Sequence, residues 1–329
     1  MAVTKQKYKR GWILTTLLMF RQQISFVLLS LICGSFLIHG MGVTIFREFP
    51  VDFGPVTYNF IDSTIDWMVV EFAWFFDGIS HYIKVWLGWL RDFFTWIPWV
   101  IVIIGMFLLG WKLTDVKIAS AAACALLLLG SFDLWESAMV TIAIMTVAVS
   151  MAIGLGIPLG IMASRSNVIQ MLIRPILDLM QTLPSFVYLV PGIMFFGLGN
   201  VSAVFAVVLY AIPPCIRLTN LGIRQVDSSV IEAGKAFGST KFQLLTKVQI
   251  PLAIPTIMAG INQTVMMALA MSTIAAMVGA GGLGMDVLRS MGQLEEGEAF
   301  VSGLGIVILA IIFDRFTQGY IRKRQQVYT

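Results

Sequence analysis

The sequence has little charge and few of the side chains on which metal sites and enzyme sites depend. Only 12% of its 329 residues are charged, whereas 58% are hydrophobic, and the mean hydropathy is +0.87. A soluble domain cannot bury that much apolar surface, so the composition predicts an all-α polytopic membrane protein. His39 and His81 lack carboxylate or cysteine neighbours at ligand spacing, and the three cysteines are scattered among apolar runs. We therefore expect no metal, no cofactor and no disulfide framework.

The chain also lacks the phosphate-binding pattern G-x-x-x-x-G-K-[ST]. The stretch GKAFGST (234–240) has similar letters in another order, and GAGGLG (279–284) follows a predicted membrane helix rather than a strand. Neither stretch therefore fits a nucleotide-binding loop. No Ser/His, His/Glu or paired-Asp constellation supports an intramembrane enzyme either. We expect no enzymatic activity here, and any ATP hydrolysis that drives this protein would reside in another chain.

Apolar runs long enough to be helical spans define the expected topology, because a helix satisfies its own backbone hydrogen bonds in hydrocarbon. About eight such spans are predicted, near 24–45, 96–112, 117–132, 137–162, 176–198, 201–216, 254–278 and 300–318. The first follows a basic leader and has no clear small-residue cleavage site after it. We interpret it as a retained anchor rather than a signal peptide.

The distribution of Lys and Arg predicts the orientation of these spans. With both termini in the cytoplasm, most basic residues fall inside, as the positive-inside rule requires. The basic residues left outside are Arg47, Lys84, Arg91 and Arg289. The pI of about 9.0 thus reflects membrane topology rather than nucleic-acid binding.

This topology suggests a division of the chain. The predicted parts are a cytoplasmic leader (1–23), an anchor (24–45), an external region (46–95), two accessory spans (96–132), a core (135–320) and a cytoplasmic tail (321–329). Residues 57–95 mix Trp and Phe with spaced carboxylates, which favours amphipathic helices on the outer membrane surface. An aromatic belt is the simplest interpretation, with a docking surface for an external partner as the alternative. A cation-binding Trp cage is a further possibility.

One polar stretch, VIEAGKAFGSTKFQLLTKVQIP (230–251), has the pattern of two short helices joined by a glycine turn. Ser229 and Glu232 have capping-box spacing, Gly238 can end a helix, and Thr240 and Gln243 repeat the capping box. Pro251 is expected to close the second segment. The topology makes this pair cytoplasmic, and its apolar residues favour docking into a groove of another protein. A loop lying on lipid and a DNA-reading helix-turn-helix are the alternatives.

The stretch 229–251 resembles the EAA loop of ABC importer permeases, with the pattern E-A-A, three residues, G, nine residues, I-x-L-P. The matching residues here are Glu232, Ala233, Gly234, Gly238, Val248, Ile250 and Pro251. Gly234 departs from the usual second alanine and is expected to loosen the first helix. The resemblance implies a type I importer permease fold in which these residues contact an ATPase.

The segments 181–201, 213–226, 248–264 and 305–318 resemble, more closely, the permease subunits of glycine betaine/proline betaine importers. That resemblance implies a bacterial cytoplasmic-membrane homodimer with a cytoplasmic ABC ATPase in two copies and an external substrate-binding protein. Choline, carnitine and trimethylamine N-oxide are alternative substrates.

Polar side chains inside the predicted spans are few. Those we expect to line the pathway are Gln181, Thr182, Asn262 and Gln263, with structural pairing across helices as the alternative. Four prolines, Pro184, Pro191, Pro213 and Pro214, are expected to kink or end helices. An ion-coupled secondary transporter is the competing class. It would need an ionisable residue well inside a span, whereas Asp178 and Asp314 lie toward the cytoplasmic ends.

Overall fold

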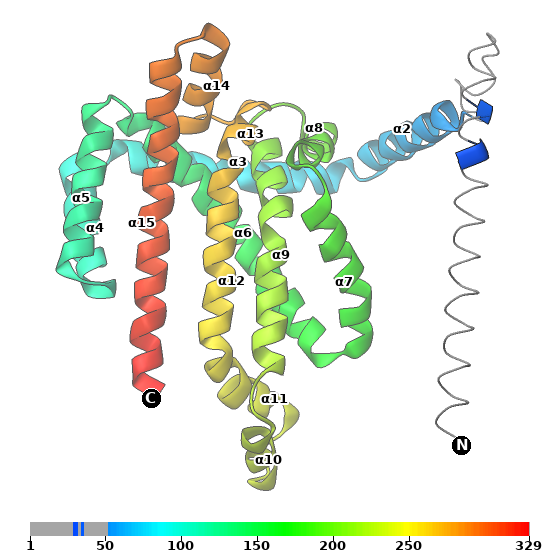
Figure 1. The fold of residues 1–329 in the computed structure, drawn as a ribbon, viewed down its shortest axis with the longest axis vertical. Coiled ribbons are helices and arrows are strands. Elements are labelled where there is room, and N and C mark those ends of the chain that lie inside the picture. The colour runs from blue at the N-terminus through cyan, green and yellow to red at the C-terminus, as the bar shows by residue number, and fades with distance from the viewer. Residues whose placement is uncertain (1–28, 32–33, 36–51, 329) are drawn as a thin grey trace. The chain divides into compact units, whose positions relative to one another are not determined.

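The computed structural model describes residues 29–31, 34–35 and 52–328, and every regular element within them is a helix (Figure 1). The chain divides into two compact units, Met1–Trp67 and Met68–Thr329. Helix α2 (Gly54–Glu71) begins in the first unit and has no buried residue. The predicted leader lies outside the described residues. Of the predicted anchor, only residues 29–31 and 34–35 are described.

The second unit contains the predicted spans that follow the anchor. Its elements are α3 (Ala73–Trp96), α4 (Trp99–Leu113), α5 (Val116–Ser131), α6 (Trp135–Arg165), α7 (Asn167–Thr182), η2 (Ser185–Tyr188), α8 (Leu189–Phe196), α9 (Asn200–Arg224), α10 (Ser228–Ala236), α11 (Lys241–Leu244), η3 (Leu245–Gln249), α12 (Ile250–Ala270), α13 (Ser272–Ala276), α14 (Leu283–Gln293) and α15 (Glu296–Tyr328). Among the described residues, four helices are long and apolar enough to cross a membrane, or up to six if each bent pair forms one span. The prediction of a polytopic helical membrane protein is confirmed.

The predicted proline breaks are only partly confirmed. The fifth predicted span is broken at Pro184, where α7 and the segment η2–α8 meet at an angle of 115°. In contrast, α9 continues through Pro213 and Pro214 to Arg224, so these two prolines do not end the helix, and the alternative that they kink it stays a prediction. Both prolines are buried, and a buried helix can tolerate proline because neighbouring helices support the freed backbone.

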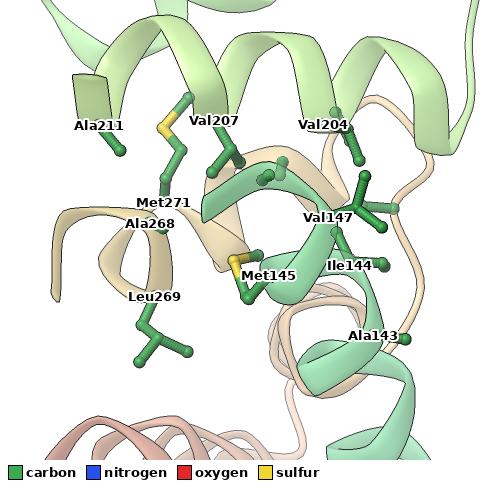
Figure 2. Close-up of a cluster of buried hydrophobic side chains, with 14 of the residues drawn as sticks. Ala143, Ile144, Met145, Val147, Val204, Val207, Ala211, Ala268, Leu269 and Met271 are labelled. Carbon is green, nitrogen blue, oxygen red and sulfur yellow. The ribbon is translucent and has the colours of Figure 1, made fainter. Parts of the chain in front are cut away.

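Helices α6, α9 and α12 form the centre of the second unit. Figure 2 shows buried side chains of α6 (Ala143, Val147), α9 (Val204, Val207) and α12 (Ala268) gathered in one cluster. Small residues allow the backbones to approach closely, as is common between membrane helices.

Two glycines lie where these helices approach one another closely. A Cβ atom on Gly160 would lie 2.6 Å from Cβ of Thr219 and 2.8 Å from the carbonyl oxygen of Ile216. A Cβ atom on Gly260 would lie 3.2 Å from the carbonyl oxygen of Pro214. Glycine therefore sets the spacing of α9 from both α6 and α12.

Helix α3 runs across the spans at the end that carries α14 (Figure 1). It packs against α6 through Ile83, Leu87 and Leu90, leaves Trp74 and Trp89 exposed, and meets α4 at an angle of 100°. This geometry fits the predicted surface helix, whose location on the outer membrane face stays a prediction.

Candidate functional site

The two-helix stretch predicted from the sequence forms a projection, residues 228–249, which we call the hairpin. It extends beyond the ends of α9 and α12, and the last turns of α15 lie at the same end of the unit (Figure 1). The first helix, α10, begins two residues earlier than predicted, because Asp227 rather than Ser229 is its N-cap. The Asp227 carboxylate accepts a hydrogen bond from the Ser229 amide at 2.8 Å. That bond lowers the pKa of Asp227, so the cap stays charged at neutral pH.

The turn between the two helices depends on Gly238, as predicted. Its φ angle is +76°, in the left-handed region that favours glycine. The Gly238 amide donates to the carbonyl of Lys235, and the Ser239 amide donates to the carbonyl of Gly234. This pair of bonds is a Schellman motif, which satisfies the last carbonyls of α10 and reverses the chain.

The second helix of the hairpin begins as predicted but does not end as predicted. Thr240 and Gln243 form the full capping box, with bonds of 2.9 and 3.2 Å. Pro251, however, does not close the segment, because the helix runs from Lys241 through the π-turn η3 and into α12 without a break. Pro251 is the second residue of α12 and comes directly after the π-turn, where the regular hydrogen-bond ladder of the α-helix is already interrupted.

Gly234 has a packing role that the sequence did not predict, while its expected loosening of the first helix stays a prediction. An added Cβ atom would lie 2.8 Å from Cδ1 of Leu244. Leu244 is the buried residue of the hairpin, and the glycine lets it pack directly against α10. Val248, which lies on the same side, is half-buried.

The outer surface of the hairpin carries large apolar side chains and one carboxylate. Phe237 is 91% exposed and Phe242 is 72% exposed. Glu232 and Ala233, on α10, are also exposed, whereas Ile250 and Pro251 are half-buried at the start of α12. Two neighbouring phenylalanines of this exposure on a polar element favour a partner surface over free contact with water.

Arginines at the root of the hairpin connect it to the spans, which the sequence did not reveal. The Arg224 guanidinium, at the end of α9, donates to the carbonyl oxygen of Ala163 and to the side-chain oxygen of Asn167, both at 2.9 Å. It thereby joins α9 to the α6–α7 turn. Arg165 makes two longer contacts, to the Lys241 carbonyl at 3.4 Å and to the Gln249 side chain at 3.5 Å.

A small apolar cluster supports these polar contacts. Ile223, Ala253 and Ile257 are buried together, and Leu245 and Ile250 pack against them. The hairpin is therefore packed directly against the ends of α9 and α12.

The four predicted pathway residues do not form one cluster. Asn262 donates to Asp314 of α15 at 2.8 Å, and Gln318 donates to the same carboxylate. This is the structural pairing that the sequence left open. Gln263 is exposed next to it, while Gln181 and Thr182 are exposed at the end of α7, before the break at Pro184.

The two carboxylates that bear on the secondary-transporter alternative both have partners. Asp314 accepts the amide bonds of Asn262 and Gln318, and Asp178 pairs with Arg217 at 2.7 Å. Both groups are occupied in contacts between or within helices, which fits a structural role better than ion coupling.

The chain resembles known transport proteins over most of its length. The family model of the binding-protein-dependent transport system inner membrane component matches residues 156–325. The glycine betaine/proline betaine transport system permease protein ProW of Escherichia coli (strain K12) is 46% identical, covering 79% of this chain and 73% of that protein. The glycine betaine transport system permease protein OpuAB of Bacillus subtilis (strain 168) is 43% identical, covering 81% and 95% respectively.

The fold is also found in a solved structure. A chain of the MetNI methionine ABC transporter, in inward-facing conformations, is 22% identical with a TM-score of 0.54, covering 58% of this chain and 95% of that one. At this identity the likeness concerns the fold alone, which is that of a type I ABC importer permease.

Proposed function

Because the chain belongs to the family of binding-protein-dependent transport system inner membrane components, we propose that it is the permease subunit of an ATP-driven importer of glycine betaine and proline betaine. The substrate class rests on two similar proteins. ProW is named as a permease for glycine betaine and proline betaine, and OpuAB as a permease for glycine betaine. The permease would be located in the bacterial cytoplasmic membrane. The core at 135–320 carries transport, and the two spans at 96–132 are accessory.

The hairpin is the observation that carries this proposal. It has capped, rigid ends, an exposed Phe237–Phe242 surface and an exposed carboxylate at Glu232. These features suit a groove in a cytoplasmic ATPase, of which two copies would serve a permease homodimer. An external binding protein would deliver the solute at the opposite end.

The distribution of charge supports a cytoplasmic hairpin and cytoplasmic termini. Arg165 and Arg224 lie at its root, and Arg322 and Lys323 lie near the end of α15 on the same side of the unit (Figure 1). Acidic residues gather toward the opposite end, next to α14, where Glu298 raises the pKa of Glu295. The arginines and the lysine have the arrangement that the positive-inside rule favours, and the acidic residues, which the rule does not include, agree with it.

Force from the ATPase would reach the pathway through α12. ATP binding can change the permease only if the ATPase contacts the hairpin differently in its two states. Displacement of the hairpin would then move α12, with Asn262 held to α15 and Gln263 free to face the solute. Gln181 and Thr182 would contribute from the break after α7.

Replacing Gly238 tests the coupling role of the hairpin. Gly238→Pro removes the amide that donates to Lys235 and forbids the φ of +76°. We expect ATP-dependent uptake to be abolished in proteoliposomes that contain the ATPase and the binding protein, with the permease present in normal amount. Gly238→Asn is the matched control, because asparagine keeps the amide and tolerates left-handed φ. Normal uptake by the proline variant would contradict the proposal.

The energy source and the substrate are tested with the unmodified complex. Uptake should stop without ATP and continue when the ion gradient is collapsed, whereas the reverse pattern would indicate a secondary transporter. Radiolabelled glycine betaine, proline betaine, choline, carnitine and trimethylamine N-oxide should be compared at equal concentration. Uptake of glycine betaine and proline betaine is expected to exceed uptake of the other three solutes. If neither betaine is taken up but another solute is taken up in an ATP-dependent way, the proposed substrate is wrong while the proposed mechanism stands.

A further inference from the structure

Two adjoining cavities lie between α15 and the pair α4–α5. The first, which we call the apolar slot, has a volume of about 430 Å³ and is lined mainly by Ile118, Ala121, Ala125, Ile308, Ile311 and Phe316. The second, which we call the basic mouth, has a volume of about 270 Å³ and is lined in part by Thr114, Asp115, Arg315, Gln318, Arg322 and Lys323. Ile118 and Arg315 line both, so the two are continuous.

The apolar slot lies between helices of membrane character. Its α5 wall is made of small residues, and its α15 wall is made of larger ones, which leaves a hydrocarbon-lined space. Its volume falls within the range of about 300–1,000 Å³ that small-molecule sites have. In a membrane, an apolar space of this kind is filled by an acyl chain rather than by water.

The basic mouth lies at the ends of two apolar helices, beside the short α4–α5 connection. It contains three cations against one carboxylate, Asp115. Within the described part of the chain, no carboxylate lies at salt-bridge distance from Arg315 or Arg322. Lys323 instead donates to the Lys112 carbonyl at 2.5 Å, which places its charge at the end of α4.

Close packing holds this arrangement in place. A Cβ atom on Gly319 would lie 2.2 Å from Cγ2 of Thr114 and 2.6 Å from the carbonyl oxygen of Leu113. A Cβ atom on Gly110 would lie 2.8 Å from the ring of Phe316. Helix α15 therefore touches both α4 and the α4–α5 connection, which fixes the position of the mouth.

We propose that the slot and the mouth together bind an anionic phospholipid. One acyl chain occupies the apolar slot, and the phosphate lies between Arg315 and Arg322, whose guanidinium groups suit phosphate oxygens. A second protein helix is a poorer occupant, because it would bury two arginines without supplying an anion. The proposal needs only that the mouth lies at a membrane boundary, so it is independent of the solute and of the direction of transport.

Lipid retention by the full-length chain tests the proposal. The purified protein in neutral detergent is titrated with dioleoylphosphatidylglycerol or dioleoylphosphatidylcholine, and bound lipid is counted by native mass spectrometry. We expect preference for phosphatidylglycerol, and about a 30-fold loss of apparent affinity in the double variant Arg315→Gln/Arg322→Gln. Arg289→Gln, an exposed arginine on α14, is the charge control and should leave retention unchanged.

A second variant tests the acyl chain separately from the phosphate. Ala121→Phe fills the slot without changing charge and should lower phosphatidylglycerol retention at least several-fold. Cys124→Phe, exposed on the same helix but outside the slot lining, should not. Each variant is first checked for monodisperse elution, and glycerol 3-phosphate serves as the probe without acyl chains.

Three results would overturn the proposal. If both lipids are retained equally, and the double arginine variant retains them as well as the unmodified protein, the basic mouth does not bind the phosphate. Full competition by glycerol 3-phosphate with no effect of Ala121→Phe would indicate a phosphate site only. Conversion of a dimer to a monomer by Ala121→Phe, with lipid retention unchanged, would place a second copy of the chain in the slot.

Discussion

The hairpin and the α6–α9–α12 core are stabilised in opposite ways. In the core, glycine and alanine bring backbones so close that Gly160 has no room for a methyl group. In the hairpin, Leu244 is buried while Phe237 is 91% exposed, and the shape comes from helix caps and a Schellman turn. The core is thus defined by packing between distant segments, whereas the hairpin is defined by local hydrogen bonds and leaves large apolar side chains exposed.

The largest effect is expected from Gly160→Val in the core. The added side chain would collide with Thr219 and with the backbone of Ile216, which cannot yield without separating α6 from α9. Overpacking a well-packed core typically costs ~1–3 kcal/mol, and backbone contact places this site at the upper end. Fluorescence-detected size-exclusion chromatography after a heating series should show loss of the folded protein at a lower temperature.

Gly154→Val is the matched control for that experiment. Gly154 lies on the same helix, but an added Cβ would have nothing within 4 Å. The control variant should elute like the unmodified protein after heating. Equal loss in both variants would mean that helix propensity, rather than contact with α9, causes the effect.

A smaller effect is expected at the root, where the two regions meet. Arg224→Lys keeps the charge but replaces the two guanidinium nitrogens that reach Asn167 and Ala163 with a single ammonium nitrogen, which lacks that fixed planar geometry. The exposed contacts should cost ~1 kcal/mol of unfolding free energy or less. Uptake per ATP hydrolysed should nevertheless fall, since α9 is no longer fastened to the α6–α7 turn.

The control at the same end of the unit is Arg174→Lys, on α7, where no comparable set of contacts is seen. Its ratio of solute transported to ATP hydrolysed should stay unchanged. If Arg224→Lys also leaves that ratio unchanged, the root does not transmit movement.

The smallest effect is expected from Gly234→Ala within the hairpin. Alanine favours a helix over glycine by about 1 kcal/mol, while the added methyl group meets only the flexible end of Leu244. The two contributions oppose each other, so uptake should stay within about twofold of the unmodified protein. Strong loss of uptake, measured beside normal membrane abundance, would show that Leu244 cannot shift.

The sequence predicted best those features that depend on neighbouring residues. The left-handed Gly238 and the Thr240–Gln243 capping box were correct, because both are determined within a few positions. The start of α10 was wrong by two residues, since Asp227 and Ser229 are both good caps and only geometry decides between them. The continuation past Pro251 was missed because the π-turn before this proline was not predicted.

Features that depend on distant residues were not predicted. The pairing of Asn262 with Asp314 joins positions 52 residues apart, and a single sequence gives no signal for it. The contact between Arg224 and Ala163 depends in the same way on how α6 and α9 approach. The fold class and the hairpin could be predicted from composition and local pattern. The contacts between the hairpin and the membrane helices depend on packing and could not.

The unbroken helix from Lys241 to Ala270 has a mechanical consequence. Its 30 residues would extend about 45 Å at the rise of an α-helix, more than the thickness of the hydrocarbon layer. A tilt imposed at Phe242 would therefore displace the far end near Ala270, although the π-turn and Pro255 interrupt the regular ladder between them. A protein that binds the hairpin would therefore act on one end of a single helix whose other end lies on the far side of the hydrocarbon layer.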